Sequence, residues 1–235
     1  MKTLRPDKTI KAVIFDLDGT LVDSEPNYFE ADRKLLARFP DVPFDETFKN
    51  QYIGMSSSEM LVDLKKRYHI PDAIADLLAE KDRYYMEIAR QKTHLFPEMK
   101  IFLDKLKAAG FKLALASGSS LAVIREILAM THITPYFDSL TSTEEVVQGK
   151  PHPAIFLEAA RRIDTAPHAC LVIEDSWRGV QAAKSAAMFC VAIPTLFSEE
   201  LNPVFHSADL LITQGISAFN AEDVCQWIEN LQSKS

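Results

Sequence analysis

Short apolar runs recur along the chain and are typical of buried strands. The first occupies residues 12–15 and ends where charged residues and a glycine follow. Similar runs occupy residues 112–116, 170–173 and 189–193. A continuous apolar run, unlike an alternating one, indicates a strand that is buried on both faces of a parallel sheet.

Segments with helical periodicity lie between these runs. The clearest is 98–109, because Pro97 precedes it and Gly110 ends it in the manner of a C-terminal cap. Further elements are expected as helices at about 120–130, 153–163, 177–187 and 221–232, with a last strand near 209–213. This alternation predicts an α/β fold with a doubly wound, Rossmann-like parallel sheet.

The chain changes character after the first run, because residues 26–94 show helical periodicity without a convincing strand. Ser56 and Glu59 have the spacing of a capping box. Two apolar stripes follow, and we interpret them as the core of a small helical bundle. They consist of Met60, Leu61, Leu64 and Tyr68, then Ile74, Leu77, Leu78, Tyr85 and Ile88. We therefore expect an all-helical domain at 26–94, inserted into a core of residues 1–25 and 95–235.

Composition narrows the class of protein. With 235 residues, 47% of them hydrophobic, the chain can bury a full core. Its formal net charge is -7 and it has no long Lys/Arg run, so a nucleic-acid partner is not expected. No export signal and no apolar stretch of roughly 20 residues is visible, which argues against a membrane location.

Three cysteines, Cys170, Cys190 and Cys225, lack any C-x-x-C spacing. We interpret them as buried free thiols in a reducing cytoplasm. The sequence does not determine the oligomeric state, and a monomer is the default expectation.

The candidate chemistry lies in four polar segments. Residues 16–20 follow the first strand, 117–119 the second, and 174–175 the third, while 149–151 open a helix. Because ligands bind outside the carboxyl ends of strands in open parallel sheets, we expect these segments to meet at one edge.

Two of these segments are acidic, with Asp16 and Asp18 in one and Glu174 and Asp175 in the other. Two carboxylate clusters at one sheet edge would repel each other unless a cation lay between them. Mg²⁺ is the natural cation, because it takes few carboxylates, keeps water ligands and leaves positions for phosphate oxygens. The sequence therefore predicts a magnesium site.

Together the four segments resemble the four motifs of the haloacid dehalogenase superfamily, in its phosphatase and phosphomutase branch. Residues 16–20 are similar to the first motif, Ser117-Gly118 to the second, Lys150-Pro151 to the third and Glu174-Asp175 to the fourth. Order and approximate spacing agree as well. A helical cap domain inserted just after the first motif is similar to the branch that includes β-phosphoglucomutase and many sugar-phosphate phosphatases.

The resemblance implies phosphoryl transfer through an aspartyl-phosphate. Asp16 would be the nucleophile, since a carboxylate is ionised at neutral pH. Asp18 would protonate the leaving alkoxide as a general acid, then act as the base that activates water. Residues two apart in an extended segment point the same way, so both carboxylates can face one phosphate.

The resemblance also implies which groups hold the phosphate and the metal. Phosphoryl oxygens would bind the N–H groups of Leu17 and Gly118, the hydroxyl of Ser117 and the ammonium of Lys150. Mg²⁺ would be held by the carboxylates of Asp16 and Asp175, the carbonyl of Asp18 and, directly or through water, Glu174. Substrate choice would reside in the cap domain, where Tyr28, Gly54, Ser57 and Lys81 are the candidates.

Two departures from the family pattern bear on the reaction. Many capped relatives have a histidine where this chain has Tyr28, and β-phosphoglucomutase-like sequences have a basic residue near the position of Ser57. A mutase must hold two phosphates in alternation, so these losses favour hydrolysis of the phosphate monoester of a small metabolite such as a phosphosugar. A β-phosphoglucomutase-type mutase is the alternative.

Two further alternatives remain. Dehalogenases of the superfamily have no use for an acid at Asp18 or for a metal cluster, so Asp18 with Glu174 and Asp175 argues against that reaction. A catalytically silent protein that keeps the fold is the other alternative, and the intact motifs argue against it.

Overall fold

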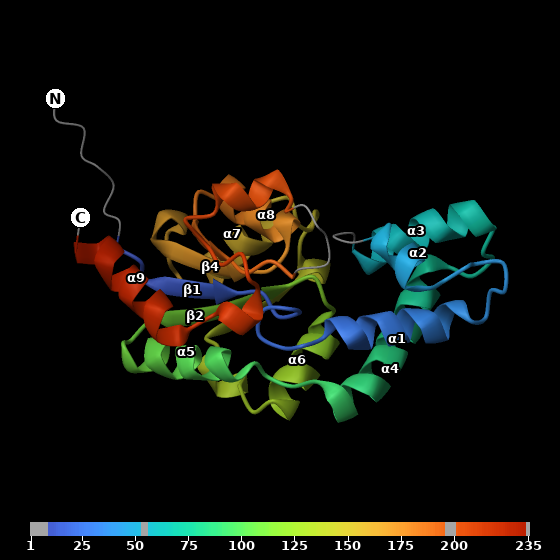
Figure 1. Ribbon diagram of the computed structural model, residues 1–235, viewed down its shortest axis with the longest axis horizontal. Coiled ribbons are helices and arrows are strands. Elements are labelled where there is room, and N and C mark those ends of the chain that lie inside the picture. The colour runs from blue at the N-terminus through green and yellow to red at the C-terminus, as the bar shows by residue number, and fades with distance from the viewer. Residues whose placement is uncertain (1–8, 53–55, 196–200, 234–235) are drawn as a thin grey trace. The chain divides into compact units, whose positions relative to one another are not determined.

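The computed structural model describes residues 9–52, 56–195 and 201–233 (Figure 1). The chain divides into two compact units. One consists of the chain up to Val22 together with the chain from Leu95 onwards, and the other is Asp23–His94. The second unit is thus an insertion in the first. Among the described residues, no helix is long and apolar enough to cross a membrane.

A six-stranded parallel sheet forms the centre of the first unit, in the order β3-β2-β1-β4-β5-β6. Its strands are β1 (Ala12–Phe15), β2 (Lys112–Ser117), β3 (Ser139–Ser142), β4 (Cys170–Glu174), β5 (Phe189–Ala192) and β6 (Leu210–Leu211). β1 lies between β2 and β4, and its four residues are fully buried. The sheet confirms the predicted α/β class.

Helices cover both faces of this sheet. They are α5 (Pro97–Ala108), α6 (Leu121–Met130), α7 (Ala154–Arg162), α8 (Trp177–Ser185) and α9 (Ala221–Ser233). Figure 1 shows α7 and α8 on one face and α5, α6 and α9 on the other. Ile14 packs in the cluster that includes α7 and α8, while its neighbour Phe15 packs edge-on against Phe102 of α5. Consecutive residues of β1 therefore supply opposite faces, which is why an unbroken apolar run marks this strand.

Short 3₁₀ turns complete the connections of this unit. They are Thr134–Tyr136, Thr143–Glu145, Pro167–Ala169, Pro203–Ser207 and Ile216–Ala218. Gly110 follows α5 with a positive φ of 81°, a conformation that glycine adopts at little cost, and this confirms the predicted C-terminal cap.

The strand β3 is not predicted by the sequence pattern. Its sequence, SLTS, has one apolar residue, so it lacks the run that marks the buried strands. It can still be a strand because it pairs with β2 alone, at the edge of the sheet. Pairing there depends on backbone hydrogen bonds, which the side-chain pattern does not reveal.

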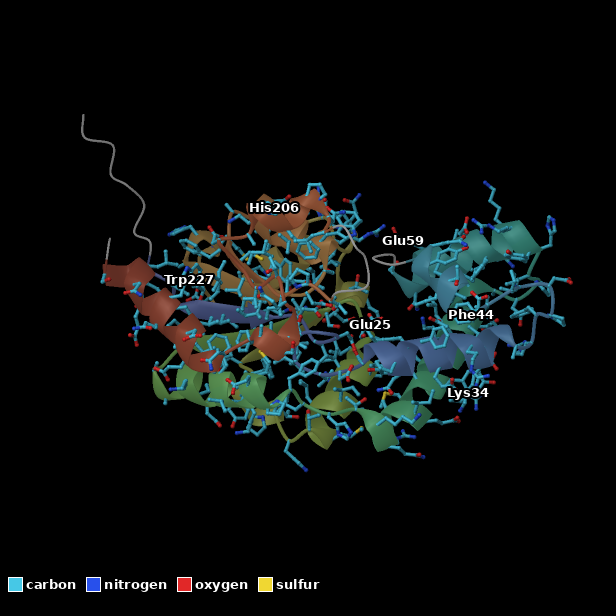
Figure 2. All side chains as sticks on the ribbon, viewed as in Figure 1. Glu25, Lys34, Phe44, Glu59, His206 and Trp227 are labelled. Carbon is cyan, nitrogen blue, oxygen red and sulfur yellow. The ribbon has the colours of Figure 1, made fainter. Side chains whose placement is uncertain are left out.

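The second unit consists of α1 (Glu25–Leu36), α2 (Glu46–Asn50), α3 (Ser57–Tyr68) and α4 (Ile74–Lys92). Its described residues contain no strand, as expected. Its core includes Leu35, Leu61, Leu64 and Leu77, and Phe44, labelled in Figure 2, stacks on Phe29 with ring centroids 5.5 Å apart.

The capping box at the start of α3 is confirmed. The Glu59 N–H donates to Ser56 Oγ at 3.2 Å, and the Ser56 N–H donates to Glu59 Oε2 at 2.8 Å. These bonds satisfy two N–H groups that a helix start otherwise leaves without partners.

The two chain segments that join the units are neighbours. Val22 forms an antiparallel bridge with Leu95, and the Asp23 N–H donates to the His94 carbonyl at 3.1 Å. The helical insertion therefore leaves the core and returns to it at one place.

Candidate active site

Asp16 lies directly after β1 with a side chain that is almost fully buried. Its N–H donates to the Ile173 carbonyl at 3.0 Å, which fixes the backbone against β4. Lys150 Nζ lies 2.5 Å from Asp16 Oδ1 and 2.5 Å from Glu174 Oε1. The structure thus brings one residue of the first, third and fourth polar segments into direct contact.

The charges of this group are strongly coupled. Burial raises the pKa of Asp16, Lys150 opposes the rise, and the Glu174 and Asp18 carboxylates add to it. Burial lowers the pKa of Lys150, but Asp16 and Glu174 outweigh burial and hold that pKa above its usual value. Lys150 therefore stays an ammonium ion at neutral pH and is a fixed positive charge. Two carboxylates, those of Asp16 and Glu174, contact the one ammonium group, so their ionised forms leave an excess of negative charge.

Glu174 is fully buried at the end of β4. Its Oε2 accepts hydrogen bonds from the Ser176 N–H at 2.8 Å and from Ser176 Oγ at 2.9 Å, while Oε1 faces Lys150. Gly179 of α8 lies against this carboxylate, because a Cβ there would be 1.8 Å from Glu174 Oε1. Both oxygens of Glu174 are thus engaged by protein groups, in space that only a glycine leaves free.

Asp175 joins the first polar segment to the chain after β5. Its Oδ2 accepts a hydrogen bond from Thr195 Oγ1 at 2.8 Å, and Oδ1 lies 3.4 Å from Thr20 Oγ1. Gly19 has a φ of 78°, and a Cβ at this position would lie 2.3 Å from Asp175 Oδ2. Glycine is therefore required here by both backbone conformation and space.

Asp18 contacts the second polar segment. Ser119 Oγ donates to Asp18 Oδ2 at 2.7 Å, and Ser117 Oγ lies 3.4 Å from the same atom. The space next to Gly118 is open, since a Cβ there would meet nothing within 4 Å. Leu17 is fully buried, and its carbonyl accepts from the Leu21 N–H at 2.9 Å, which tightens the turn after Asp16.

The donor atoms fit a hard divalent cation. Within the described residues, no group of three or more His, Cys, Asp or Glu side chains is arranged to hold a metal ion. Mg²⁺ does not need such a group, because it is commonly bound through one or two carboxylates, waters and substrate phosphate oxygens. Asp16, Asp175 and the Asp18 carbonyl are oxygen donors of that kind, and the excess negative charge favours a cation.

Three of the four predicted specificity residues lie together in the helical unit. Lys81, only 2% exposed, has its Nζ 2.7 Å from Ser57 Oγ and 5.3 Å from the centre of the Tyr28 ring. Tyr28 in turn stacks on Tyr85 with centroids 4.2 Å apart. Gly54 lies outside the described residues.

Sequence reasoning missed Asp32, the acidic partner of Lys81. Asp32 is fully buried, with Oδ1 2.5 Å from Lys81 Nζ and Oδ2 2.6 Å from Lys49 Nζ. Burial lowers the pKa of Lys81, and Asp32 opposes this change. A signal was present, because Asp32 stands on the buried face of α1, one turn before Leu35 and Leu36.

Four further residues of the site had no predicted role: Ser119, Ser176, Gly179 and Thr195. Each contacts, or makes room for, a predicted acidic residue, yet none has a spacing that sets it apart from ordinary turn and helix-cap residues. Only the folded arrangement reveals them.

The sequence matches one family model and is similar to several named proteins. The sequence model of the family described as haloacid dehalogenase-like hydrolase matches residues 10–187. A protein named phosphorylated carbohydrates phosphatase from Thermotoga maritima is 33% identical over 183 residues, covering 76% of this chain and 82% of that protein. The β-phosphoglucomutase of Bacillus subtilis is 34% identical over 192 residues, covering 78% and 83%.

A solved structure gives a similar result. The crystal structure of CbbY from Rhodobacter sphaeroides in complex with phosphate matches with a TM-score of 0.80 and 25% identity. It covers 89% of this chain and 96% of that one. The similar proteins thus include both a phosphatase and a phosphomutase.

Proposed function

Because this chain belongs to the haloacid dehalogenase-like hydrolase family, we propose that it is a Mg²⁺-dependent phosphatase that hydrolyses the phosphate monoester of a small metabolite. The observation that carries the proposal is the different environment of two neighbouring carboxylates. Asp16 is paired with a permanent cation, Lys150, whereas Asp18 is held by serine hydroxyls. Lys150 opposes the rise in the pKa of Asp16 and so stabilises the carboxylate form that attacks phosphorus, whereas the hydroxyls around Asp18 suit a group that gains and loses a proton.

In the first half-reaction an oxygen of Asp16 attacks the phosphorus. A bond from Asp16 to phosphorus forms as the bond to the substrate oxygen breaks, and Asp18 gives its proton to that oxygen. Lys150 and the hydroxyl of Ser117 stabilise the charge on the phosphoryl oxygens. In the second half-reaction Asp18 takes a proton from water, which attacks phosphorus, frees Asp16 and releases inorganic phosphate.

Residues at the same edge of the sheet would hold the metal. They are the carboxylates of Asp16 and Asp175 and the backbone carbonyl of Asp18. Since both oxygens of Glu174 are engaged by Lys150 and Ser176, we propose that Glu174 acts on the metal through water. Bound Mg²⁺ supplies positive charge to the transferring phosphoryl group.

We propose that residues 26–94 form the domain that selects the substrate, through Tyr28 and Ser57, and that the buried Lys81 holds the hydroxyl of Ser57 in place. A phosphosugar is the favoured substrate class, because the similar proteins act on phosphorylated carbohydrates or glucose phosphates according to their names. Hydrolysis is favoured over the phosphomutase reaction. Tyr28 carries no charge, and Lys81, the cation bonded to Ser57, already has Asp32 as a counterion.

The direct test is phosphate release from p-nitrophenyl phosphate with Mg²⁺ and with chelator. We expect turnover only with Mg²⁺, and its loss in Asp16→Asn, whose amide keeps the shape but not the nucleophile. Asp23→Asn is the matched control, because Asp23 is exposed and should be dispensable for activity. Near-normal turnover by Asp16→Asn would contradict covalent catalysis.

The alternative reaction is tested with β-glucose 1-phosphate, followed by phosphorus NMR with a trace of the 1,6-bisphosphate as primer. The phosphatase proposal predicts that any consumption of this ester gives glucose and inorganic phosphate. Build-up of glucose 6-phosphate that outpaces phosphate release would instead establish a phosphomutase.

A further inference from the structure

The contact between Ser119 and Asp18 is the shorter of the two serine contacts with this carboxylate. Ser119 Oγ lies 2.7 Å from Asp18 Oδ2, an ordinary distance for a good O–H···O bond, whereas the 3.4 Å from Ser117 Oγ is at the limit of a hydrogen bond. Ser119 is therefore the main hydroxyl partner of Asp18 in this segment. Ser117 keeps its hydroxyl for another acceptor, such as a phosphate oxygen.

Ser119 is itself fixed by neighbours on both sides of its side chain. Its N–H donates to Ser117 Oγ at 3.0 Å, and its carbonyl accepts from Ser142 Oγ, at the end of β3, at 2.7 Å. Two residues further on, the Leu121 N–H donates to Glu144 Oε2 at 3.0 Å. The peptide groups around Ser119 are thus held by Ser142 at the end of β3 and by Glu144 just after it, which fixes the backbone from which the Ser119 side chain extends.

We propose that Ser119 is the positioning residue for Asp18, holding its carboxyl group in place for proton transfer during phosphoryl transfer. The inference rests on the proposed function, because it presumes that Asp18 is the general acid and base. It adds to the site a residue whose side chain contacts Asp18.

The chemistry of a hydroxyl suits this position. Asp18 must be a carboxylic acid before the first half-reaction and a carboxylate before the second. A serine hydroxyl donates to a carboxylate and accepts from a carboxylic acid, so Ser119 can hold Asp18 in both states. A lysine such as Lys150 donates only, and it would favour the carboxylate. The partners of Asp16 and Asp18 therefore match the different tasks of the two residues.

The test compares phenyl phosphate with p-nitrophenyl phosphate, two esters of similar size and different leaving groups. Phenolate needs a proton as it leaves, whereas nitrophenolate leaves readily without one. We expect Ser119→Ala to lower kcat/KM for phenyl phosphate at least about 10-fold, part of the 10²–10⁴-fold that general acids contribute. For p-nitrophenyl phosphate, kcat/KM should stay within about 3-fold, since kcat/KM reports the first half-reaction only.

Two further variants separate the possible causes. Ser119→Thr keeps a hydroxyl and should restore most of the lost activity on phenyl phosphate. In an Asp18→Asn background, Ser119→Ala should have no further effect on the ratio of the two kcat/KM values, because the group that it positions is no longer an acid. Thermal unfolding of each variant confirms that the fold is retained.

The outcomes distinguish failure of the inference from failure of the proposed function. If Asp18→Asn lowers kcat/KM for both esters equally, Asp18 is not the general acid and the proposed mechanism is wrong. If Asp18→Asn discriminates between the esters but Ser119→Ala lowers both equally, Ser119 acts on the shared phosphate and the positioning role is overturned.

Discussion

Replacing Gly179 with alanine should displace the buried carboxylate of Glu174. A Cβ at position 179 would lie 1.8 Å from Oε1, 1.9 Å from Cδ and 2.4 Å from Oε2 of Glu174. No rotation of a methyl group avoids three such distances. Because α8 and β4 are both packed into the core, the side chain of Glu174 must move, and it must give up its bonds to Ser176 and Lys150.

The magnitude follows from two opposing effects. Alanine is better than glycine by about 1 kcal/mol in a helix interior, and since Gly179 lies in the first turn of α8 this effect favours the variant by at most that amount. Hydrogen bonds to a charged group contribute about 1.5–3 kcal/mol each, and we expect that at least two of the three to Glu174 are lost. The net destabilisation is then about 2–5 kcal/mol, and the melting temperature of a chain this long should fall by roughly 5–15 °C.

The assay is thermal unfolding by calorimetry, together with phosphate release. Gly118→Ala is the matched control for stability, because a Cβ there meets nothing within 4 Å. Glu174→Ala is the second comparison, since removing the carboxylate removes the clash, so alanine at 179 should cost much less in that background. A Gly179→Ala protein that melts at or above the wild-type temperature with full turnover would refute the reasoning.

The remaining predictions concern the acidic residue Asp175, the buried thiols and the ion pair of the helical unit. Asp175→Ala should weaken Mg²⁺ binding, measured by calorimetry, and should reproduce the effect of chelator on turnover. Ca²⁺ should restore the turnover of chelator-treated wild type poorly, because it permits geometries that misalign the nucleophile. Burial raises the pKa of Cys170 to about 12, so the two buried thiols should resist iodoacetamide at pH 8, and mass spectrometry should find modification confined to the half-buried Cys225 until the protein is unfolded. Asp32→Asn should destabilise the helical unit by about 3–5 kcal/mol, because Lys81 loses a buried counterion. Asp32 opposes the lowering of the Lys81 pKa by burial, so in the folded variant Lys81 releases its proton at a lower pH than in wild type. The variant therefore gains more stability than wild type as pH rises, and the loss should shrink, as followed by circular dichroism.

Much of the fold could be predicted from the sequence, because strands buried on both faces have continuous apolar runs. Both faces of β1 are covered by helices, so every residue of Ala12–Phe15 is apolar and the strand is visible. β3 has no such apolar run, since an edge strand is held by backbone hydrogen bonds and can have polar side chains. The order of strands in the sheet could not be read either, because it depends on which strands pair across long stretches of chain.

In the candidate site, the acidic residues could be predicted from the sequence, whereas most residues that contact them could not. Asp16, Asp18 and Glu174 could be found because each lies at or just after the carboxyl end of a strand in a parallel sheet, where position alone indicates a ligand site. The groups that hold them are different. Ser119 reaches Asp18 across 101 positions of sequence, and nothing in a serine near a helix start reveals that contact. Asp32 could have been suspected, because a charge on the buried face of a helix requires a partner.

The two ends of the helical unit lie next to each other, and this affects which insertions and deletions the fold can accept during evolution. Val22 and Leu95 are bridged in the core, and Asp23 and His94 are bonded in the insertion, so the two ends of the insertion are held a strand's width apart. For the core, any segment that spans this short gap is topologically equivalent, and a longer one adds little closure entropy. During evolution, the segment between Asp23 and His94 can therefore be replaced, lengthened or shortened while the catalytic edge of the sheet stays unchanged.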